Sequence, residues 1–445
     1  MENATLIDYE KAKSRAVIVG VHLESERDEY SVIQDLNELE ALLKTLGVET
    51  VGREIQKRQK LSPSHLIGTG KAEEVADLVH QTEAGLIVID YPLTGPQIRN
   101  IEKLTKCQVL DRAGVILDIF ARHAKTNEAK TQVEIAQLEY LLPRLTGAWT
   151  HFGRQSGGGV KSRGMGEKQI EVDRRRAREK ITRLQKRLEQ IEKEKANQRK
   201  SRRNEIKVAI VGYTNSGKTT IMKTLTKAAT PGKDELFATL DASIRTIDPN
   251  TRPKILLSDT VGFIRNLPHG LIESFKSTLA EVLDANLLLH VVDVSHSNYK
   301  SQMETTEKVL AEIGASEIET LLVFNKMDQV DDQFLGRIMA KKYEGSICIS
   351  AHSQSDIRRL RDHIFTHFQQ QFHEKEITLR ADDIESLSMV YKLCVVNDAD
   401  YETEGQVTFK VRAPQHTLDR ILKTSAKESE GDVSPGEIEK TSEEI

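Results

Sequence analysis

Cysteine is scarce in this sequence of 445 residues: Cys107, Cys348 and Cys394 lie far apart. They form no C-x-x-C pair, which excludes a disulfide scaffold and a cysteine zinc site and is typical of a reducing cytoplasm. None of the 13 histidines has the spacing of metal ligands. No apolar run approaches the ~18 residues of a membrane span, and the polar start MENATLIDYEK lacks a signal-peptide core. We therefore expect a cytoplasmic protein without a membrane span.

The charge is nearly balanced overall but unevenly distributed. The 64 Lys and Arg stand against 68 Asp and Glu, a formal net charge of −4 that by itself argues against a nucleic-acid partner. Residues 171–203, however, contain 14 basic and 6 acidic residues, and 154–203 contain 18 basic and 7 acidic ones, a net of +11. The final segment, 427–445, has seven acidic residues and two lysines. The near-neutral total therefore does not exclude an RNA partner.

The fold class expected from the first 124 residues is α/β, with a parallel sheet, because short apolar strands alternate with helices. The expected strands are 15–21, 48–51, 86–90 and 108–110, and the expected helices are 31–46, 71–81 and 96–105. At roughly 100–200 residues per domain, the whole chain should contain two to four domains. We find no internal repeats.

Residues 125–204 predict a long antiparallel helical hairpin, with helices at 125–145 and 167–203. In the second helix apolar residues recur at spacings of four and three, which is a coiled-coil seam: Ala177, Ile181, Leu184, Leu188 and Ile191. Two stripes of the first helix could face this seam, and both stay open: Val133, Ala136 and Tyr140, or Ile135, Leu138 and Leu142.

Strands and helices return over 205–372 and predict a second α/β domain. Its expected strands are 206–211, 243–247, 255–259, 287–293, 321–324 and 347–350, and its last helix is 355–371. Residues 373–426 predict a small α+β domain with strands at 388–396 and 406–411 and a helix near Leu418. The acidic tail, 427–445, has few large apolar groups and is expected to be disordered.

A phosphate-binding motif, G-x-x-x-x-G-K-[ST], occupies Gly212–Thr219 between an apolar strand and a helical stretch, which is the context it requires. In such a loop the backbone N–H groups surround the phosphates, and the helix N-terminus adds a favourable dipole. Lys218 is expected to reach the β- and γ-phosphates and Thr219 to bind Mg²⁺. The flanking elements disfavour an ordinary glycine loop. The expected nucleotide contacts are Gly212, Tyr213, Thr214, Asn215, Ser216, Gly217, Lys218, Thr219 and Thr220.

Three later motifs decide which nucleotide is expected. A D-x-x-G motif at 259–262 ends a strand, where Asp259 would hold Mg²⁺ through water and the Gly262 N–H would face the γ-phosphate. An N-K-x-D motif follows the strand at 321–324, and its carboxylate can accept from guanine N1 and N2, which favours GTP over ATP. Together with Ser350-Ala351, the order of these motifs along the chain predicts a GTPase. The further expected contacts are Asn325, Lys326, Asp328, Ser350 and Ala351.

A GTPase also needs a threonine ahead of its second strand that contacts the γ-phosphate and Mg²⁺. Thr246 lies in a predicted strand, so Thr239 is the candidate, and it joins Lys218 and Gly262 as an expected catalytic group. Phe263 stands where many GTPases have a glutamine that orients the attacking water. A phenyl ring cannot do this, so we expect a low intrinsic rate. The carbonyl of Asn215 either helps to bind K⁺ or merely suits a tight turn, and the two hypotheses stand equal.

The linker of the predicted hairpin favours shape-driven RNA contact. Six glycines lie between Gly153 and Gly166, and Trp149, His151 and Phe152 offer rings for stacking. A solvated helix with i,i+4 ion pairs is the alternative for the basic stretch. Gly68–Lys71 could also hold a phosphate, but a tight loop-to-helix turn is favoured there. The candidate RNA contacts are Arg154, Gly157, Gly158, Gly159, Lys161, Arg163, Lys168, Arg174, Arg175 and Arg176.

Over roughly residues 15–415 the chain resembles the HflX-type, ribosome-associated translational GTPases. The similarity rests on IGTGKAEEV (67–75), VLDRAGVILDIFARHAKTNEAKTQVEIAQLEYLLPRLTGAWTH (109–151), GYTNSGKTT (212–220), ELFATLD (235–241), DTVGFIRNLPHGLIESFKSTL (259–279) and NKMD (325–328). The resemblance implies that the hairpin enters the peptidyl-transferase region of the large ribosomal subunit. It implies that the GTP-bound protein helps to separate stalled or hibernating ribosomes, and that subunit-stimulated hydrolysis favours release. It also supports Thr239 and accounts for the hydrophobic residue at 263.

The chain departs from the family in the hairpin loop, usually close to RGPGETQLE, which here is RGMGEKQIE (163–171). Met165 in place of Pro frees the backbone, and Lys168 in place of Thr adds a charge near the expected RNA contact. We expect a monomer that binds GTP or GDP and keeps the large ribosomal subunit and its rRNA as partners. The alternatives are a ribosome-assembly or RNA-chaperone GTPase acting on precursor subunits, and a nucleotide-sensing interaction module.

Overall fold

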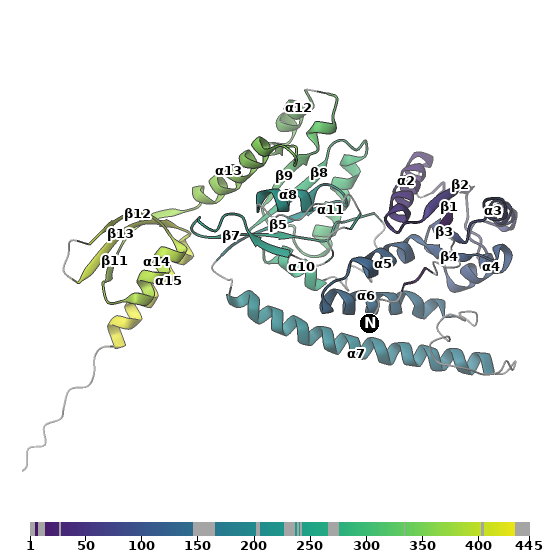
Figure 1. The fold of residues 1–445 in the computed structure, drawn as a ribbon, viewed down its shortest axis with the longest axis horizontal. Helices are drawn as coiled ribbons and strands as arrows, with labels where there is room; N and C mark the ends of the chain where they lie inside the picture. Colours follow the sequence, from purple (N-terminus) through teal and green to yellow (C-terminus); the bar gives the residue numbers. More distant parts are fainter. Residues whose placement is uncertain are drawn as a thin grey trace, which may run out of the picture.

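The computed structural model describes residues 5–7, 14–25, 28–145, 165–201, 205–226, 236–237, 240, 243–265, 276–332, 334–401 and 405–431. An α/β domain lies at one end of the molecule, a second α/β domain in the middle and a small sheet domain at the other end (Figure 1). This arrangement confirms the predicted α/β fold class. In the described part of the chain, no helix has the length and apolar character to cross a membrane.

The N-terminal sheet has four parallel strands in the order β2-β1-β3-β4. Its elements are β1 (Arg15–Leu23), α2 (Glu29–Thr45), β2 (Glu49–Arg58), α3 (Thr69–Thr82), β3 (Leu86–Asp90), α4 (Gly95–Thr105), β4 (Gln108–Asp111) and α5 (Arg112–His123). Alternate residues of β1 enter different cores: Ile18 packs with α2 and α5, whereas Val17 and Val19 pack with α3 and α4. Helices therefore cover both faces of the sheet, as expected for parallel strands.

Helix α5 is an element of this domain that the sequence pattern did not predict. Asp111 caps it by accepting the Gly114 N–H at 3.1 Å. Every residue from Val115 to Ala121 is buried, including Asp118, whose carboxylate accepts the Ile7 N–H at 2.7 Å. The run Val115–Phe120 is apolar except for Asp118, and a short, almost continuous apolar run cannot be assigned to helix or strand from its periodicity alone.

Helices α6 (Asn127–Leu141) and α7 (Met165–Ser201) pack against each other in antiparallel directions. Glu134 pairs with Lys180 at 2.5 Å, and the earlier Glu128 pairs with a later lysine, Lys195. Of the two stripes left open by the sequence, one faces α7: Ile135 and Leu138 contact Ile181, Leu184 and Leu188. The other stripe, Val133, Ala136 and Tyr140, packs into the N-terminal core. Both stripes are used because α6 lies between the domain and α7.

The second sheet has six strands in the order β10-β9-β8-β5-β7-β6, all parallel except β6, which runs antiparallel to β7. They are β5 (Ile206–Gly212), β6 (Ser243–Thr246), β7 (Ile255–Asp259), β8 (Leu287–Asp293), β9 (Thr320–Asn325) and a short β10 (Ile347–Cys348). One face packs with α8 (Lys218–Leu225) and α13 (Gln354–Gln370). The other packs with α10 (Lys276–Leu283) and α11 (Tyr299–Glu312). A further helix, α12 (Leu335–Lys342), follows β9.

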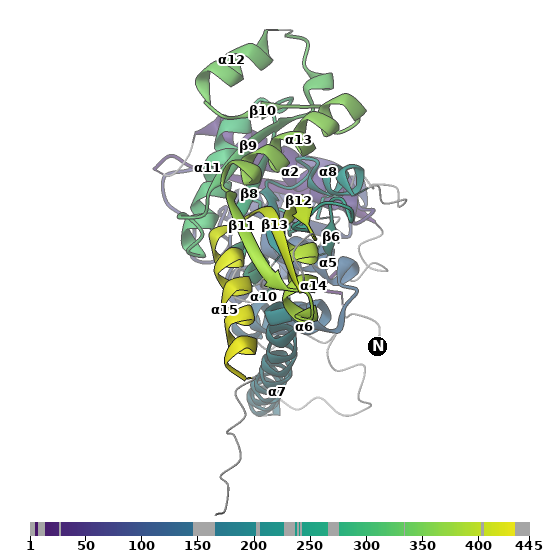
Figure 2. The same ribbon diagram turned by 90° about the vertical axis from the view of Figure 1, so that its left-hand side faces the viewer.

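The C-terminal domain is an antiparallel sheet, β11-β13-β12, with two helices (Figure 2). Its elements are β11 (His373–Arg380), α14 (Ile384–Leu393), β12 (Val395–Asp400), β13 (Gln406–Ala413) and α15 (Gln415–Gly431). The predicted strand 388–396 is wrong over Ser388–Leu393, which is helical. Asp383 caps this helix by accepting the Ser386 N–H at 2.8 Å, and Val390 is buried in the domain core. Local β-propensity was overridden by this cap and this packing.

Two further differences concern the edges of the C-terminal domain. The sequence did not predict β11, because HEKEITLR is mostly charged and polar and only Ile377 and Leu379 are buried. Helix α15 continues to Gly431, into the segment 427–445 that was expected to be disordered. The rest of that segment, 432–445, lies outside the described residues.

Candidate nucleotide site

The phosphate loop, Gly212–Thr219, connects the central strand β5 to helix α8. Gly212 has φ +146° and Gly217 has φ +94°. A Cβ atom at Gly212 would lie 2.3 Å from the carbonyl oxygen of Val291, and one at Gly217 would lie 2.2 Å from Nδ2 of Asn325. Both positions of the motif therefore need glycine for backbone conformation and for space.

Lys218 begins α8 and is buried. Its Nζ donates to the carbonyl oxygens of Gly212 at 3.1 Å and Tyr213 at 2.6 Å, so the ammonium group lies inside the loop. Burial lowers the pKa of Lys218 to about 8, although the Asp259 carboxylate acts in the opposite direction. Within the loop Thr214 and Ser216 are also buried, and Thr220 follows in the first turn of α8, where its carbonyl accepts the Thr224 hydroxyl at 2.8 Å.

Asp259 lies at the carboxyl end of β7 and is only 1% exposed. Its Oδ2 accepts the Thr219 hydroxyl at 2.8 Å, which brings together the two groups predicted to hold Mg²⁺. Gly262 lies close to the loop, because a Cβ atom there would be 3.0 Å from both Nζ of Lys218 and Cα of Thr214.

Two backbone hydrogen bonds hold the segment after Gly262 on the phosphate loop. The Phe263 N–H donates to the Gly212 carbonyl at 3.1 Å, and the Thr214 N–H donates to the Phe263 carbonyl at 2.7 Å. The Phe263 ring is 3% exposed and packs in the core with Val211 and Leu279. This position therefore presents backbone, and no polar side chain, to the loop.

Asn325 connects three motifs. Its Nδ2 donates to the Ser216 carbonyl at 2.8 Å, and its Oδ1 accepts the Ala351 N–H at 3.0 Å. The neighbouring Lys326 has φ +63° and its Nζ lies 2.8 Å from Oδ2 of Asp293, whereas the Asp328 side chain is exposed. Ser350 is buried and its hydroxyl accepts the His352 N–H at 3.3 Å. Four stretches far apart in the sequence thus meet at the carboxyl ends of β5, β7, β9 and β10.

Asn215 is exposed and has φ +58°. It borders a cleft of about 190 Å³ between the phosphate loop and α2, whose lining includes Asp35, Glu38, Leu236, Arg265 and Asp293. The sequence pattern did not single out Asp35, Glu38, Arg265 or Asp293. Only Asp293 carried a local signal, because it is the polar end of an apolar strand, as Asp259 is.

Several predicted site residues lie outside the described part of the chain: Thr239, Arg154, Gly157, Gly158, Gly159, Lys161 and Arg163. Trp149, His151 and Phe152 lie outside it too. The backbone of Lys168 is part of α7. Arg174 donates to the Leu145 carbonyl at 2.9 Å, whereas Arg175 and Arg176 are exposed.

Two weaker candidate sites, Thr246 and Gly68–Lys71, lie in the structural elements that the sequence predicted for them, a strand and a loop-to-helix turn. Thr246 lies in strand β6. Gly68 precedes α3 with φ +91°, and the Lys71 ammonium group pairs with Glu54 at 2.6 Å and Glu74 at 2.8 Å. Its charge is therefore balanced by carboxylates within the N-terminal domain.

The glycine-bounded loop on the central strand of a parallel sheet, with D-x-x-G, N-K-x-D and S-A around it, defines a P-loop GTPase. Three family models match in succession: GTP-binding GTPase N-terminal (33–121), GTP-binding GTPase middle region (123–202) and 50S ribosome-binding GTPase (207–326). The GTPase HflX of Escherichia coli K12 is 39% identical over 425 residues, covering 94% of this chain and 98% of that protein. The chain belongs to the GTPase HflX family, and it is a GTP-binding, GTP-hydrolysing protein.

Two more GTPase HflX relatives agree with this assignment. The GTPase HflX of Gluconacetobacter diazotrophicus is 38% identical, covering 92% of this chain and 98% of that protein. That of Flavobacterium psychrophilum is 46% identical over 72% of this chain and 76% of that protein. Among solved structures, a GTP-binding protein from Sulfolobus solfataricus in complex with GDP is 26% identical, with a TM-score of 0.43 over 79% of this chain and 97% of that one.

Proposed function

We propose that this GTPase binds the large ribosomal subunit through α7 and its adjoining loop, and that it promotes the separation of stalled or hibernating ribosomes into subunits. The observation that carries the proposal is the orientation of α7. Its apolar seam packs on α6, and its exposed basic residues include Arg175, Arg176, Arg178, Arg183, Lys186 and Arg187. An RNA backbone suits such a stripe, because each cation can neutralise one of many closely spaced phosphates. The description of the matching family model, 50S ribosome-binding GTPase, supports the same partner.

For the GTP site we assign the phosphates to the backbone N–H groups of the phosphate loop and to Lys218, whose buried ammonium group is already directed into the loop. Asp328 is assigned to guanine. Asn325 bonds to both the Ser216 carbonyl and the Ala351 N–H, and it thereby fixes the phosphate loop relative to Ser350-Ala351. The Gly262 N–H and Thr239 are assigned to the γ-phosphate. These groups position GTP and stabilise the charge that develops on the transferred phosphoryl group.

The residues present fit Mg²⁺. The Thr219 hydroxyl and the Asp259 carboxylate are oxygen donors 2.8 Å apart at the mouth of the loop, and oxygen ligands are what this ion prefers. Among the described residues, no group of three or more His, Cys, Asp or Glu could hold a metal ion by itself. Thr219 would hold the ion directly and Asp259 through water, and Thr239, outside the described residues, is the third expected ligand. When bound, Mg²⁺ neutralises charge on the β- and γ-phosphate oxygens.

From Phe263 we infer a low intrinsic rate of GTP hydrolysis. Its ring is in the core, so position 263 offers no side chain that could orient the attacking water. We therefore propose that hydrolysis depends on an activator, which is the bound ribosomal subunit.

The test is sedimentation of purified 70S ribosomes with the protein loaded with GTP. Conversion of 70S particles into subunits supports the proposal, and binding to precursor particles alone would indicate an assembly role instead. The variant R183Q/K186Q/R187Q removes three exposed cations from the outer face of α7. Its binding should weaken, and the slope of log affinity against log salt should fall by about 2–3, since each phosphate contact contributes about 0.7–0.9.

A matched control removes three exposed cations from α12, in the variant R337Q/K341Q/K342Q. This change lowers the net charge equally but lies on another surface, so ribosome binding should stay close to that of the parent. If both triple variants lose the same affinity for the ribosome, the ribosome attracts the protein through its net charge, and α7 is not the specific binding surface.

A further inference from the structure

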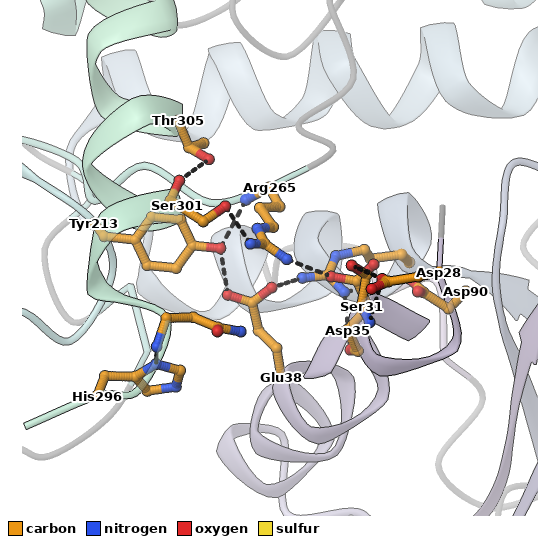
Figure 3. A network of polar contacts seen from close by, with 12 residues as sticks. Asp28, Ser31, Asp35, Glu38, Asp90, Tyr213, Arg265, His296, Ser301 and Thr305 are labelled. Carbon is orange, nitrogen blue, oxygen red and sulfur yellow. Dashed lines mark hydrogen bonds and ion pairs between the residues drawn. The ribbon is translucent and has the colours of Figure 1, made fainter. Parts of the chain in front are cut away.

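Tyr213 belongs to the phosphate loop, but its side chain extends toward the N-terminal domain (Figure 3). The side chain is 4% exposed, and its hydroxyl donates to Oε1 of Glu38 at 2.5 Å. The same hydroxyl accepts the backbone N–H of Arg265 at 2.9 Å. Glu38 lies on α2 and Arg265 lies three residues after Gly262. One hydroxyl group therefore joins the phosphate loop, the segment after Gly262 and the N-terminal domain.

Arg265 makes a second connection between the same parts. Its guanidinium group donates to Oδ1 of Asp35 at 3.2 Å and to the hydroxyl of Ser301 on α11 (Figure 3). Asp35 and Glu38 are three residues apart on α2 and therefore share a helix face. We call Tyr213, Arg265, Asp35 and Glu38 the latch.

Glu38 is itself held from the side of the N-terminal domain. It pairs with Arg112, which also donates to Oδ1 of Asp90 at 3.2 Å and to the Asp35 carbonyl at 3.2 Å. Arg112 is 4% exposed. Burial disfavours its charge, but Glu38 and Asp90 outweigh this effect and raise the pKa of Arg112. A buried network with its charges paired in this way fixes the position of the carboxylate that Tyr213 contacts.

The latch bears on a part of the site that we assign to the γ-phosphate, the group that distinguishes GTP from GDP. Gly262 has no side chain and the Phe263 ring is in the core, so these two positions can face the γ-phosphate only through their backbone. Two backbone hydrogen bonds fix Phe263 on the loop, and the latch fixes Arg265. We propose that Glu38 and the Tyr213 hydroxyl are positioning residues that hold Gly262–Arg265 where the Gly262 N–H meets the γ-phosphate. This inference rests on the GTP site of the proposed function and needs no ribosome.

The test compares the affinity of the full-length protein for GDP with that for a non-hydrolysable GTP analogue, both measured by fluorescence titration. Tyr213→Phe removes only the hydroxyl, and Glu38→Gln keeps the shape of the side chain but removes its charge. In both variants the Kd of the analogue should rise about three- to tenfold, the net worth of one hydrogen bond. In Glu38→Gln the Kd of GDP should stay within about twofold of the parent. Because both changes act through one hydroxyl, the double variant should bind the analogue no more weakly than the weaker single variant.

Tyr343→Phe is the matched control, because it removes a hydroxyl from a tyrosine that packs on Phe324 elsewhere in the same domain. It should change neither affinity. The proposal is overturned if Glu38→Gln weakens GDP and the analogue equally, if the analogue binds unchanged, or if it binds more tightly, which would make the latch a restraint. If the parent itself fails to bind GDP, the nucleotide site of the proposed function is wrong as well.

Discussion

Replacing Asn325 by alanine tests how the nucleotide site is held together. The side chain is 1% exposed, and its two hydrogen bonds connect the Ser216 carbonyl of the phosphate loop with the Ala351 N–H beyond β10. Each bond contributes about 1 kcal/mol net, but each buried backbone group left unpaired costs about 1–3 kcal/mol. We therefore expect Asn325→Ala to lower the free energy of unfolding by about 2–6 kcal/mol. The Kd of GDP should rise more than about tenfold, because the loop is no longer tied to Ser350-Ala351.

The measurement is urea denaturation of the nucleotide-free protein, followed by a GDP titration. Asn286→Ala is the control: its Oδ1 also accepts a backbone N–H, from Lys207 at 2.9 Å, but this bond is exposed. Asn286→Ala should lower the free energy of unfolding by about 1 kcal/mol or less and leave the Kd of GDP unchanged. Equal losses of stability and of GDP affinity in the two variants would refute the reasoning. The burial of Asn325 and its hydrogen bonds to two other motifs would then contribute nothing.

Two further predictions concern the phosphate loop. Burial lowers the pKa of Lys218 to about 8 in the absence of nucleotide, and phosphates must raise it again, so GDP binding near pH 8.5 should take up protons. Calorimetry in two buffers of different ionisation enthalpy measures this uptake, which Lys218→Arg, charged throughout, should lack; an uptake that persists in this variant would rule Lys218 out as its source. For Asn215 the K⁺ hypothesis predicts faster GTP turnover in KCl than in NaCl, and loss of the difference in Asn215→Gly, which accepts φ +58° without offering a side-chain carbonyl. Equal turnover of the parent in both salts would discard the K⁺ hypothesis and leave Asn215 as a turn residue.

The parts of the site that could be predicted from sequence are contiguous motifs at the ends of strands. Gly212–Thr219, Asp259 and Asn325 each stand directly after an apolar run, so the geometry of a parallel sheet brings them together. The latch could not be predicted in this way. Glu38 and Tyr213 are 175 positions apart, and nothing in either local sequence marks a partner.

The sequence pattern missed two helices, for different reasons. Helix α5 contains a short, almost continuous apolar run, which periodicity alone cannot assign to helix or strand, whereas α14 begins with an aspartate cap but continues with residues that favour a strand. Burial on two sides explains the two stripes of α6. Each was a plausible face for the seam of α7, and neither could be rejected, because one packs on α7 and the other on the N-terminal core.

Helix α6 is buried on two sides, and this determines how the nucleotide can act on α7. Since α6 packs on α5 on one side and on α7 on the other, α7 is expected to move together with the N-terminal domain. A signal from the GTP site can then cross at the contact between the phosphate loop and α2, and also where Phe237 packs on Phe120 of α5 with ring centroids 4.7 Å apart. Beyond the contact with α2, Arg112 opens α5, and the preceding Asp111 accepts the Tyr140 hydroxyl at 2.9 Å and pairs with Arg144 at 2.8 Å, at the end of α6. Coupling through these contacts must be reciprocal, so RNA bound at α7 would raise the affinity for GTP by the same factor by which GTP raises the affinity for RNA.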